Sequence, residues 1–251
     1  MTRAPMCKSS WLVCLCVLAS LLLLTAGAIA NPTANAPLET NVTTKEVKIF
    51  GVIYPARFNS AEGDEARYHL LVWQGGTSAN ALIETPVDDL AFHDALASLG
   101  ALPGDNLTMS SWNKRYDPNH PEPKRKVEGA HLDIRFSWKE QPLGIPIAQA
   151  FQGAQKREYE TFPQSQVSSL QSQAPSLQWR FGGNRDRLFN TIPFAPRPGC
   201  LACLYSCPSG KVSNRALSVH EYVETPSRFA ANTAILPPDG TPVVVTFLLA
   251  Q

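Results

Sequence analysis

Residues 130–139, with the sequence AHLDIRFSWK, carry the clearest structural signal in the chain. Apolar residues fall at alternate positions of this segment, and polar or charged residues fill the positions between them. The apolar set is Leu132, Ile134, Phe136 and Trp138. Because successive side chains of a β-strand point to opposite faces, the pattern predicts an antiparallel strand with one buried and one solvated face.

Weaker patterns predict further strands. Residues 47–53 alternate roughly between apolar and other side chains, and the apolar run 68–73 ends near the glycine pair Gly75-Gly76. Residues 243–249 form a continuous apolar run, for which we expect cover on both faces of the strand.

Two helices have recognisable start and stop signals. The first is expected at 88–99, with Asp88 as its N-cap and Gly100 at its end. The second is short and is expected at 218–224, where Ser218 and Glu221 have the spacing of a capping box. We therefore expect an α+β fold: a β-rich, mostly antiparallel sheet with one main helix, a C-terminal cysteine loop and a short helix.

Composition limits the functional classes. Of the 251 residues, 44% are hydrophobic, which suits a globular protein and excludes a disordered chain. The 21 prolines amount to about 8%, against a usual value of about 5%, and favour short elements joined by rigid turns. The 22 basic and 21 acidic residues nearly cancel, so the charge shows no field for nucleic acid and identifies no partner.

The first thirty residues resemble an export signal. Arg3 and Lys8 precede a nearly unbroken apolar run at 11–25, and residues 28–30 read Ala-Ile-Ala, a pattern typical of signal-peptidase cleavage. The run is shorter than the ~20 residues that span a bilayer. We predict cleavage before Asn31, export to the periplasm or the extracellular space, and no stable membrane span in the mature protein.

The expected domain organisation follows from these boundaries. Residues 1–30 form the signal peptide, and 31–44, rich in Pro, Ala, Asn and Thr, form a flexible leader. Residues 45–251 form one domain, with the Ser- and Gln-rich stretch 164–178 as its candidate seam.

Cleavage would leave three cysteines within eight residues, Cys200, Cys203 and Cys207. An odd number of cysteines in an exported protein cannot pair completely within one chain. Their spacing, C-x2-C-x3-C-P, equals the last three cysteines of the bacterial ferredoxin pattern, although Arg197 stands where the first cysteine would be. Thiolates this close together in a turn can converge on one soft metal centre, so these three cysteines are the candidate ligands.

Two histidines bear on this site. His220 is the histidine nearest to the cysteines in sequence, so it or a solvent molecule is the candidate for a further ligand. His69 lies within an apolar run, and we expect it to be a core histidine rather than a ligand. His93 is expected to face solvent on the first helix.

The segment 180–187, RFGGNRDR, has two interpretations. Two glycines between arginines allow backbone amides and guanidinium groups to meet an anion. Alternatively, Arg185 and Arg187 form ordinary ion pairs, and we favour this structural interpretation.

Residues 200–214, CLACLYSCPSGKVSN, followed by HEYV at 220–223, resemble the YdjY-type family of exported bacterial proteins. Three further segments agree with this family: YHLLVWQGG at 68–76, LGALPGD at 99–105 and RFGGNR at 180–185. The resemblance extends over nearly the whole mature chain. Because members are often labelled ferredoxin-like, it implies a 4Fe-4S cluster held by the three cysteines.

Two functions remain open at this point. The first is an exported redox or metal-binding module, such as an iron–sulfur electron-transfer protein, with an unidentified redox partner. The second is a non-enzymatic periplasmic binding or assembly factor in which two cysteines form a disulfide and the third is an exchangeable thiol. Oxidising conditions outside the cytosol favour disulfides, and three cysteines leave a four-iron cluster one ligand short. The sequence does not distinguish a cluster, a zinc ion and a disulfide.

Overall fold

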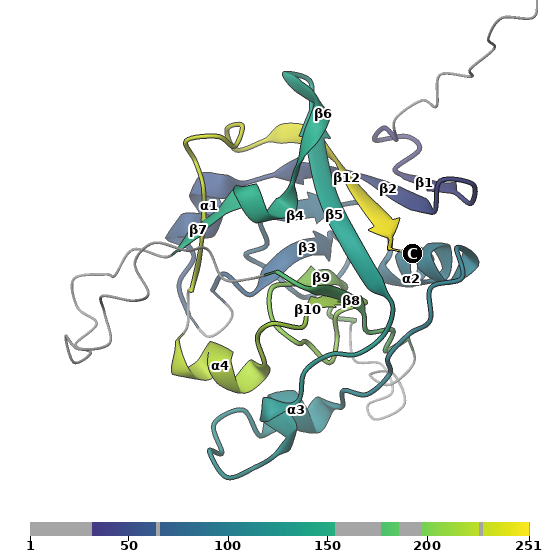
Figure 1. Cartoon of the computed structure of the whole chain (residues 1–251). Helices are drawn as coiled ribbons and strands as arrows, with labels where there is room; N and C mark the ends of the chain where they lie inside the picture. Colours follow the sequence, from purple (N-terminus) through teal and green to yellow (C-terminus); the bar gives the residue numbers. More distant parts are fainter. Residues whose placement is uncertain (1–31, 64–65, 154–176, 186–196, 226–227, 251) are drawn as a thin grey trace, which may run out of the picture. The chain divides into compact units, whose positions relative to one another are not determined.

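A computed structural model describes residues 32–63, 66–153, 177–185, 197–225 and 228–250 (Figure 1). The chain divides into two units, Met1–Ala30 and Asn31–Gln251, and every described residue belongs to the second. The predicted signal segment and most of the candidate seam at 164–178 therefore lie outside the described residues. In the described ranges, no helix is both long and apolar enough to cross a membrane.

The described residues form strands joined by short helices. The strands are β1 (Leu38–Asn41), β2 (Glu46–Ile53), β3 (His69–Trp73), β4 (Ile83–Thr85), β5 (His131–Trp138), β6 (Gln141–Pro146), β7 (Phe151–Gly153), β8 (Trp179–Phe181), β9 (Cys200–Cys203), β10 (Val212–Asn214), β11 (Phe229–Ala231) and β12 (Thr241–Leu249). The α-helices are α1 (Pro55–Ser60), α2 (Asp89–Ser98), α3 (Met109–Asn113) and α4 (Val219–Glu224), with 3-10 turns at Glu122–Lys124 and Ile147–Ala150.

The main sheet closes on itself, so the expected α+β fold class is wrong. Its strand order is β2-β12-β5-β8-β10-β9-β3-β4, and β4 pairs back to β2, which gives a closed barrel of eight strands within the described residues. β1 and β6 extend the sheet beside β2 and β5, and β7 and β11 form a separate pair. The helices of this part of the chain are short, so none forms a layer against the sheet.

Strand β5 confirms the alternation seen in the sequence. Leu132, Ile134 and Phe136 are buried, whereas the alternate residues His131, Asp133 and Arg135 are exposed. Trp138 is half-buried, and its ring stacks on Phe136 with 5.4 Å between centroids. β5 lies between β12 and β8 in the barrel, so only its apolar face points into the core.

The apolar run 243–249 forms a strand as expected, β12, but the expected full cover on both of its faces is wrong. In β12 the side chains of Val243, Val245 and Phe247 are buried, whereas those of Val244 and Thr246 between them are half-buried. A strand of a closed barrel has only one face toward the interior. The apolar run 68–73 does correspond to a strand with both faces covered, because His69 to Val72 are all buried in β3.

Both helix caps are confirmed. The Asp88 carboxylate accepts hydrogen bonds from the Leu90 and Ala91 amides at the start of α2, and Ser218 with Glu221 forms the capping box of α4.

His93 of α2 is buried, against the expectation of a solvated side chain. Its Nδ1 lies 3.0 Å from Asp94 Oδ1, and its ring packs on Phe181 of β8 with 5.1 Å between centroids. The helix rests on the barrel along this side as well as along its Phe92 side. Within the expected leader 31–44, Leu38–Asn41 pairs with β2 as strand β1, so this part is ordered sheet.

Candidate metal site

The structure places the three predicted cysteines in and directly after β9. Cys200 and Cys203 are the first and last residues of that strand, and Cys207 lies in the connection to β10, which runs parallel to β9. All three side chains are buried, and all three are free thiols rather than members of a disulfide. The disulfide expected in the second hypothesis is therefore not formed among the described cysteines.

An irregularity between β3 and β9 turns Cys200 and Cys203 toward each other. Side chains three residues apart in a regular strand point to opposite faces. Here Leu71 pairs with Ala202 while Val72 pairs with Cys200, so Leu201 is an extra residue on β9. Such a bulge interrupts the alternation once and re-aims the neighbouring side chain. This places the two thiols on the same side of the strand.

His69 completes the group, and the expectation of a core histidine missed it. His69 lies directly opposite Cys203 across the β3–β9 pairing, so the two side chains share a face. Its Nδ1 lies 3.7 Å from Cys200 Sγ and 3.6 Å from Cys203 Sγ. The possible ligand atoms of His69, Cys200 and Cys203 all lie within 4.8 Å of one another, and Cys207 is not part of this group.

His220, the candidate ligand by sequence proximity, is placed elsewhere. It lies on α4, where its Nε2 is 3.2 Å from Glu224 Oε1, one helical turn ahead. It is not a member of the metal-ligand group formed by the described residues. One feature of the sequence could have marked His69 as a candidate ligand: it is the one polar side chain between Tyr68 and Trp73, in an otherwise apolar run.

The electrostatics of the thiols are unequal. Hydrogen bonds from the Cys203 and Cys207 thiols, with a further contribution from His69, hold the pKa of Cys200 well below its ordinary value despite burial. Burial raises the pKa of Cys203 well above its ordinary value and that of Cys207 to about 12, and the neighbouring Cys200 raises both further. The group thus favours one thiolate in the absence of a metal.

The turn after Cys207 holds its sulfur in place. The Cys207 amide donates to Ser213 Oγ at 3.3 Å, and the Ser209 amide hydrogen-bonds to the Cys207 sulfur, which favours its thiolate. A Cβ at Gly210 would lie 2.7 Å from Ser213 Oγ and 3.1 Å from Cys203 Sγ. The Pro-Ser-Gly sequence therefore provides both an N–H donor to sulfur and the close approach that the site requires.

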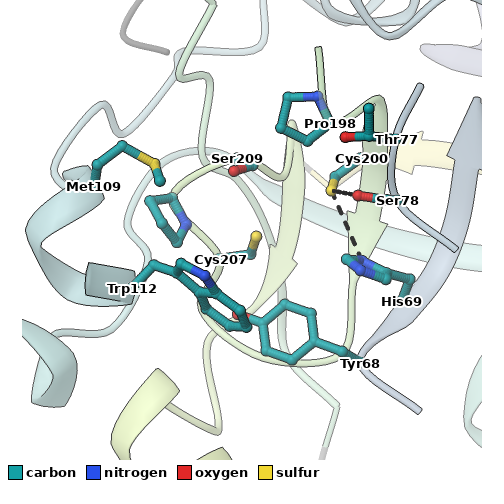
Figure 2. A pocket seen from close by; sticks show the side chains of 11 residues that line it. Tyr68, His69, Thr77, Ser78, Met109, Trp112, Pro198, Cys200, Cys207 and Ser209 are labelled. Atoms are coloured by element: carbon teal, nitrogen blue, oxygen red, sulfur yellow. Dashed lines mark hydrogen bonds between the residues drawn. The ribbon is translucent and has the colours of Figure 1, made fainter. Parts of the chain in front are cut away.

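A cavity of about 150 Å³ adjoins the thiols (Figure 2). Cys200, Cys207 and His69 line it, whereas Cys203 is not among its lining residues. Ser78 Oγ is 3.0 Å from Cys200 Sγ, as the dashed line in Figure 2 shows. The remaining wall combines hydroxyl groups with apolar side chains: Tyr68, Thr77, Met109, Trp112, Pro198, Pro208 and Ser209.

The arginine segment forms no anion site among the described residues. Arg185 pairs with Asp94 through two contacts of 2.9 and 3.0 Å, and the Asn184 amide donates to Asp105 Oδ1 at 2.7 Å. Residues 186 and 187 lie outside the described ranges. The structural interpretation therefore holds for Arg185.

The spacing of the donors fits one metal ion. Zinc bonds of about 2.3 Å to sulfur and 2.0–2.1 Å to nitrogen give a sulfur–nitrogen edge of about 3.6 Å in a tetrahedral site. The observed separations of 3.6 and 3.7 Å match that edge. A four-iron cluster instead places iron and sulfide atoms between its ligand atoms, which must then lie farther apart. The donor spacing does not fit the cluster that the ferredoxin label implies.

The fold and site define the class: a closed β-barrel with a buried histidine–cysteine group that can hold a metal ion. The family model described as "YdjY domain" matches residues 38–248. The chain is 33% identical over 190 residues to "Uncharacterized protein YdjY" of Escherichia coli (strain K12), covering 75% of this chain and 69% of that protein. The chain belongs to the YdjY family. No solved structure matches it.

Proposed function

We propose that this protein binds a single thiophilic transition-metal ion outside the cytosol, with His69, Cys200 and Cys203 as ligands. The observation that carries the proposal is the compact buried group of His69, Cys200 and Cys203, whose ligand atoms lie within 4.8 Å of one another and whose imidazole–thiol contacts of 3.6 and 3.7 Å are close to an edge of a tetrahedral site. The export signal at residues 1–30 supports the location.

The chemistry of the donors selects the class of ion. Thiolate and imidazole ligands favour zinc(II) and copper(I), whereas magnesium and calcium prefer carboxylate and carbonyl oxygens. The low pKa of Cys200 supplies the first thiolate without a large cost. A bound cation then favours ionisation of the other thiols as well.

Thiol redox chemistry is the second candidate, and the Cys200 environment favours it. A cysteine of lowered pKa at the start of a C-x-x-C motif is the usual attacking thiol in disulfide exchange. Cys200 also lines the cavity, so a small reagent can approach it. Metal binding is preferred because His69 lies within reach of two sulfurs, an arrangement that a dithiol does not need.

Metal analysis of the protein purified under anaerobic conditions from the extracytoplasmic fraction tests the proposal. We expect about one zinc or copper per chain and no acid-labile sulfide. C203S should lose most of the metal, because it removes one of only three protein ligands. A parallel variant, H131A, removes an exposed histidine of β5 and should retain the metal.

Folding must be checked alongside, because Cys203 is fully buried. Thermal unfolding of the metal-free proteins shows whether C203S retains its fold. Metal-free wild-type protein, or equal metal in folded C203S and wild type, would refute the assignment. Stoichiometric iron with acid-labile sulfide would establish the cluster instead.

A further inference from the structure

The cavity lined by Cys200, Cys207 and His69 adjoins the candidate metal ligands, so a molecule bound in it would contact the ion. Structural zinc sites are closed by four protein ligands, whereas reactive sites keep a position open beside a cavity. His69, Cys200 and Cys203 form the compact group, and Cys207 lies outside it although it lines the cavity. The position facing the cavity is therefore the one at which the ion can change ligands.

Tyr68 supplies an independent observation. Its side chain is 1% exposed and lines the cavity, and its hydroxyl hydrogen-bonds to the Cys207 side chain. A thiolate bound in the cavity would offer this donor a charged acceptor, and hydrogen bonds to charged groups are stronger than those to neutral groups.

The surroundings of Tyr68 fix its direction. Its ring stacks on Tyr205 at 5.3 Å and meets the edges of Tyr222 at 4.8 Å and Trp112 at 5.3 Å, so three aromatic rings hold it in place. Figure 2 shows Tyr68 below Cys207 with Trp112 beside it. The phenol is held as a donor at the cavity end nearest the sulfurs.

We propose that the cavity binds a small thiol as an exchangeable ligand of the metal, an inference that rests on the proposed function. The thiol would bind to the ion as a thiolate at the cavity-facing position in place of a water molecule, and its proton would go to solvent. No electron is transferred, and the ion keeps its charge. Tyr68 donates its hydrogen bond to the incoming thiolate.

The size and lining of the cavity match this class of ligand. A volume of about 150 Å³ corresponds to about five water molecules, enough for a thiol of a few heavy atoms and too small for a peptide. Soft metals prefer sulfur to oxygen ligands. The hydroxyls of Thr77, Ser78 and Ser209 can bind a polar end, while Trp112 and Pro198 cover an apolar stem.

Cobalt(II) loaded into the full mature chain provides the readout, because its visible bands report its ligands. Titration with 2-mercaptoethanol should produce a saturable change in the thiolate-to-cobalt band while dialysis shows that the cobalt stays bound. Ethylene glycol, with oxygen in place of sulfur, should leave the spectrum unchanged. Y68F should weaken thiol binding by about tenfold or more, the effect of losing a hydrogen bond to a charged group.

Y205F is the matched control. Tyr205 is equally buried and stacks on the Tyr68 ring, but it does not line the cavity. Equal weakening in both variants would assign the effect to packing and overturn the proposal. So would an unchanged spectrum, or cobalt stripped from the protein by the thiol. Failure of the chain to bind cobalt at all would refute the metal site itself.

Discussion

Replacing Gly210 by alanine should weaken metal binding without removing any ligand. The new Cβ would lie 2.7 Å from Ser213 Oγ, 3.0 Å from the Val212 carbonyl and 3.1 Å from Cys203 Sγ. Gly210 is not among the residues of positive φ, so the cost arises from contact and not from the backbone. Something must move, and the atoms that can move are the Ser213 hydroxyl and the Cys203 sulfur.

The magnitude follows from the cost of overpacking. An extra methyl group in a well-packed interior typically costs about 1–3 kcal/mol. If the Cys203 sulfur is displaced, the same free energy appears as weaker metal binding, about 5- to 150-fold. Competition with a zinc chelator measures the affinity, and urea unfolding of the metal-free protein measures the stability.

Ser209→Ala is the control for this turn. It retains the amide that hydrogen-bonds to Cys207 and removes only a half-buried hydroxyl, so we expect stability within about 0.5 kcal/mol of wild type and unchanged zinc affinity. If Gly210→Ala bound zinc as tightly as wild type while losing stability, the close approach to Cys203 would have no role in the site. That result would refute the reasoning.

Three further outcomes are expected. Phe136→Ala should lower the free energy of unfolding by about 3–5 kcal/mol, because it leaves a cavity in the core. Arg135 is exposed, so Arg135→Ala should change the free energy of unfolding by less than about 0.5 kcal/mol, and equal denaturation midpoints for the two variants would contradict a strand with one buried and one exposed face. In metal-free protein at pH 8, iodoacetamide should modify Cys200 before Cys207, because the lowered pKa of Cys200 makes it the thiolate while that of Cys207 is raised to about 12; mass spectrometry of peptides after partial alkylation checks this order. Amino-terminal sequencing of exported material should begin at Asn31, and a retained apolar segment would contradict the predicted cleavage.

Local patterns predicted the local elements correctly. Periodicity and capping residues are enough to predict an element whose signals lie close together in the sequence. This holds for strand β5, for the capped helix α2 and for the capping box of α4. The cysteine loop was predictable for the same reason, since Cys200 and Cys207 are close in sequence.

Closure of the barrel was not predictable in this way. It depends on β4, β8 and β10, each three residues long, which are too short to show a period. It also depends on pairings between strands far apart in the chain, such as β2 with β12. An open sheet with one main helix is the natural expectation when these contacts are unknown.

His69 was missed for the same physical reason. It lies 131 residues before Cys200 in the chain, and only the β3–β9 pairing brings the two together. The bulge at Leu201, which turns the Cys200 side chain toward Cys203, could not be predicted either, because the sequence of the short apolar strand β9 does not indicate it. The ligand spacing that distinguishes one ion from a cluster is therefore visible only in the folded chain.

Helix α2 is tied by ion pairs to both ends of the segment that carries the three cysteines, residues 197–211. Arg197 and Lys211 flank that segment, and both bind Asp89, the first residue of α2, at 3.0 and 3.3 Å. Lys211 and Asp89 are almost fully buried. Because removing two charges from water costs several kcal/mol per ion, such a pair is a poor source of net stability. Its effect is positional: one helical turn holds both ends of the segment, so the sulfurs of Cys200 and Cys203 meet His69 at a fixed distance. The helix that the sequence predicted as the main element is thus the anchor of the metal-binding segment, and the barrel supplies the histidine.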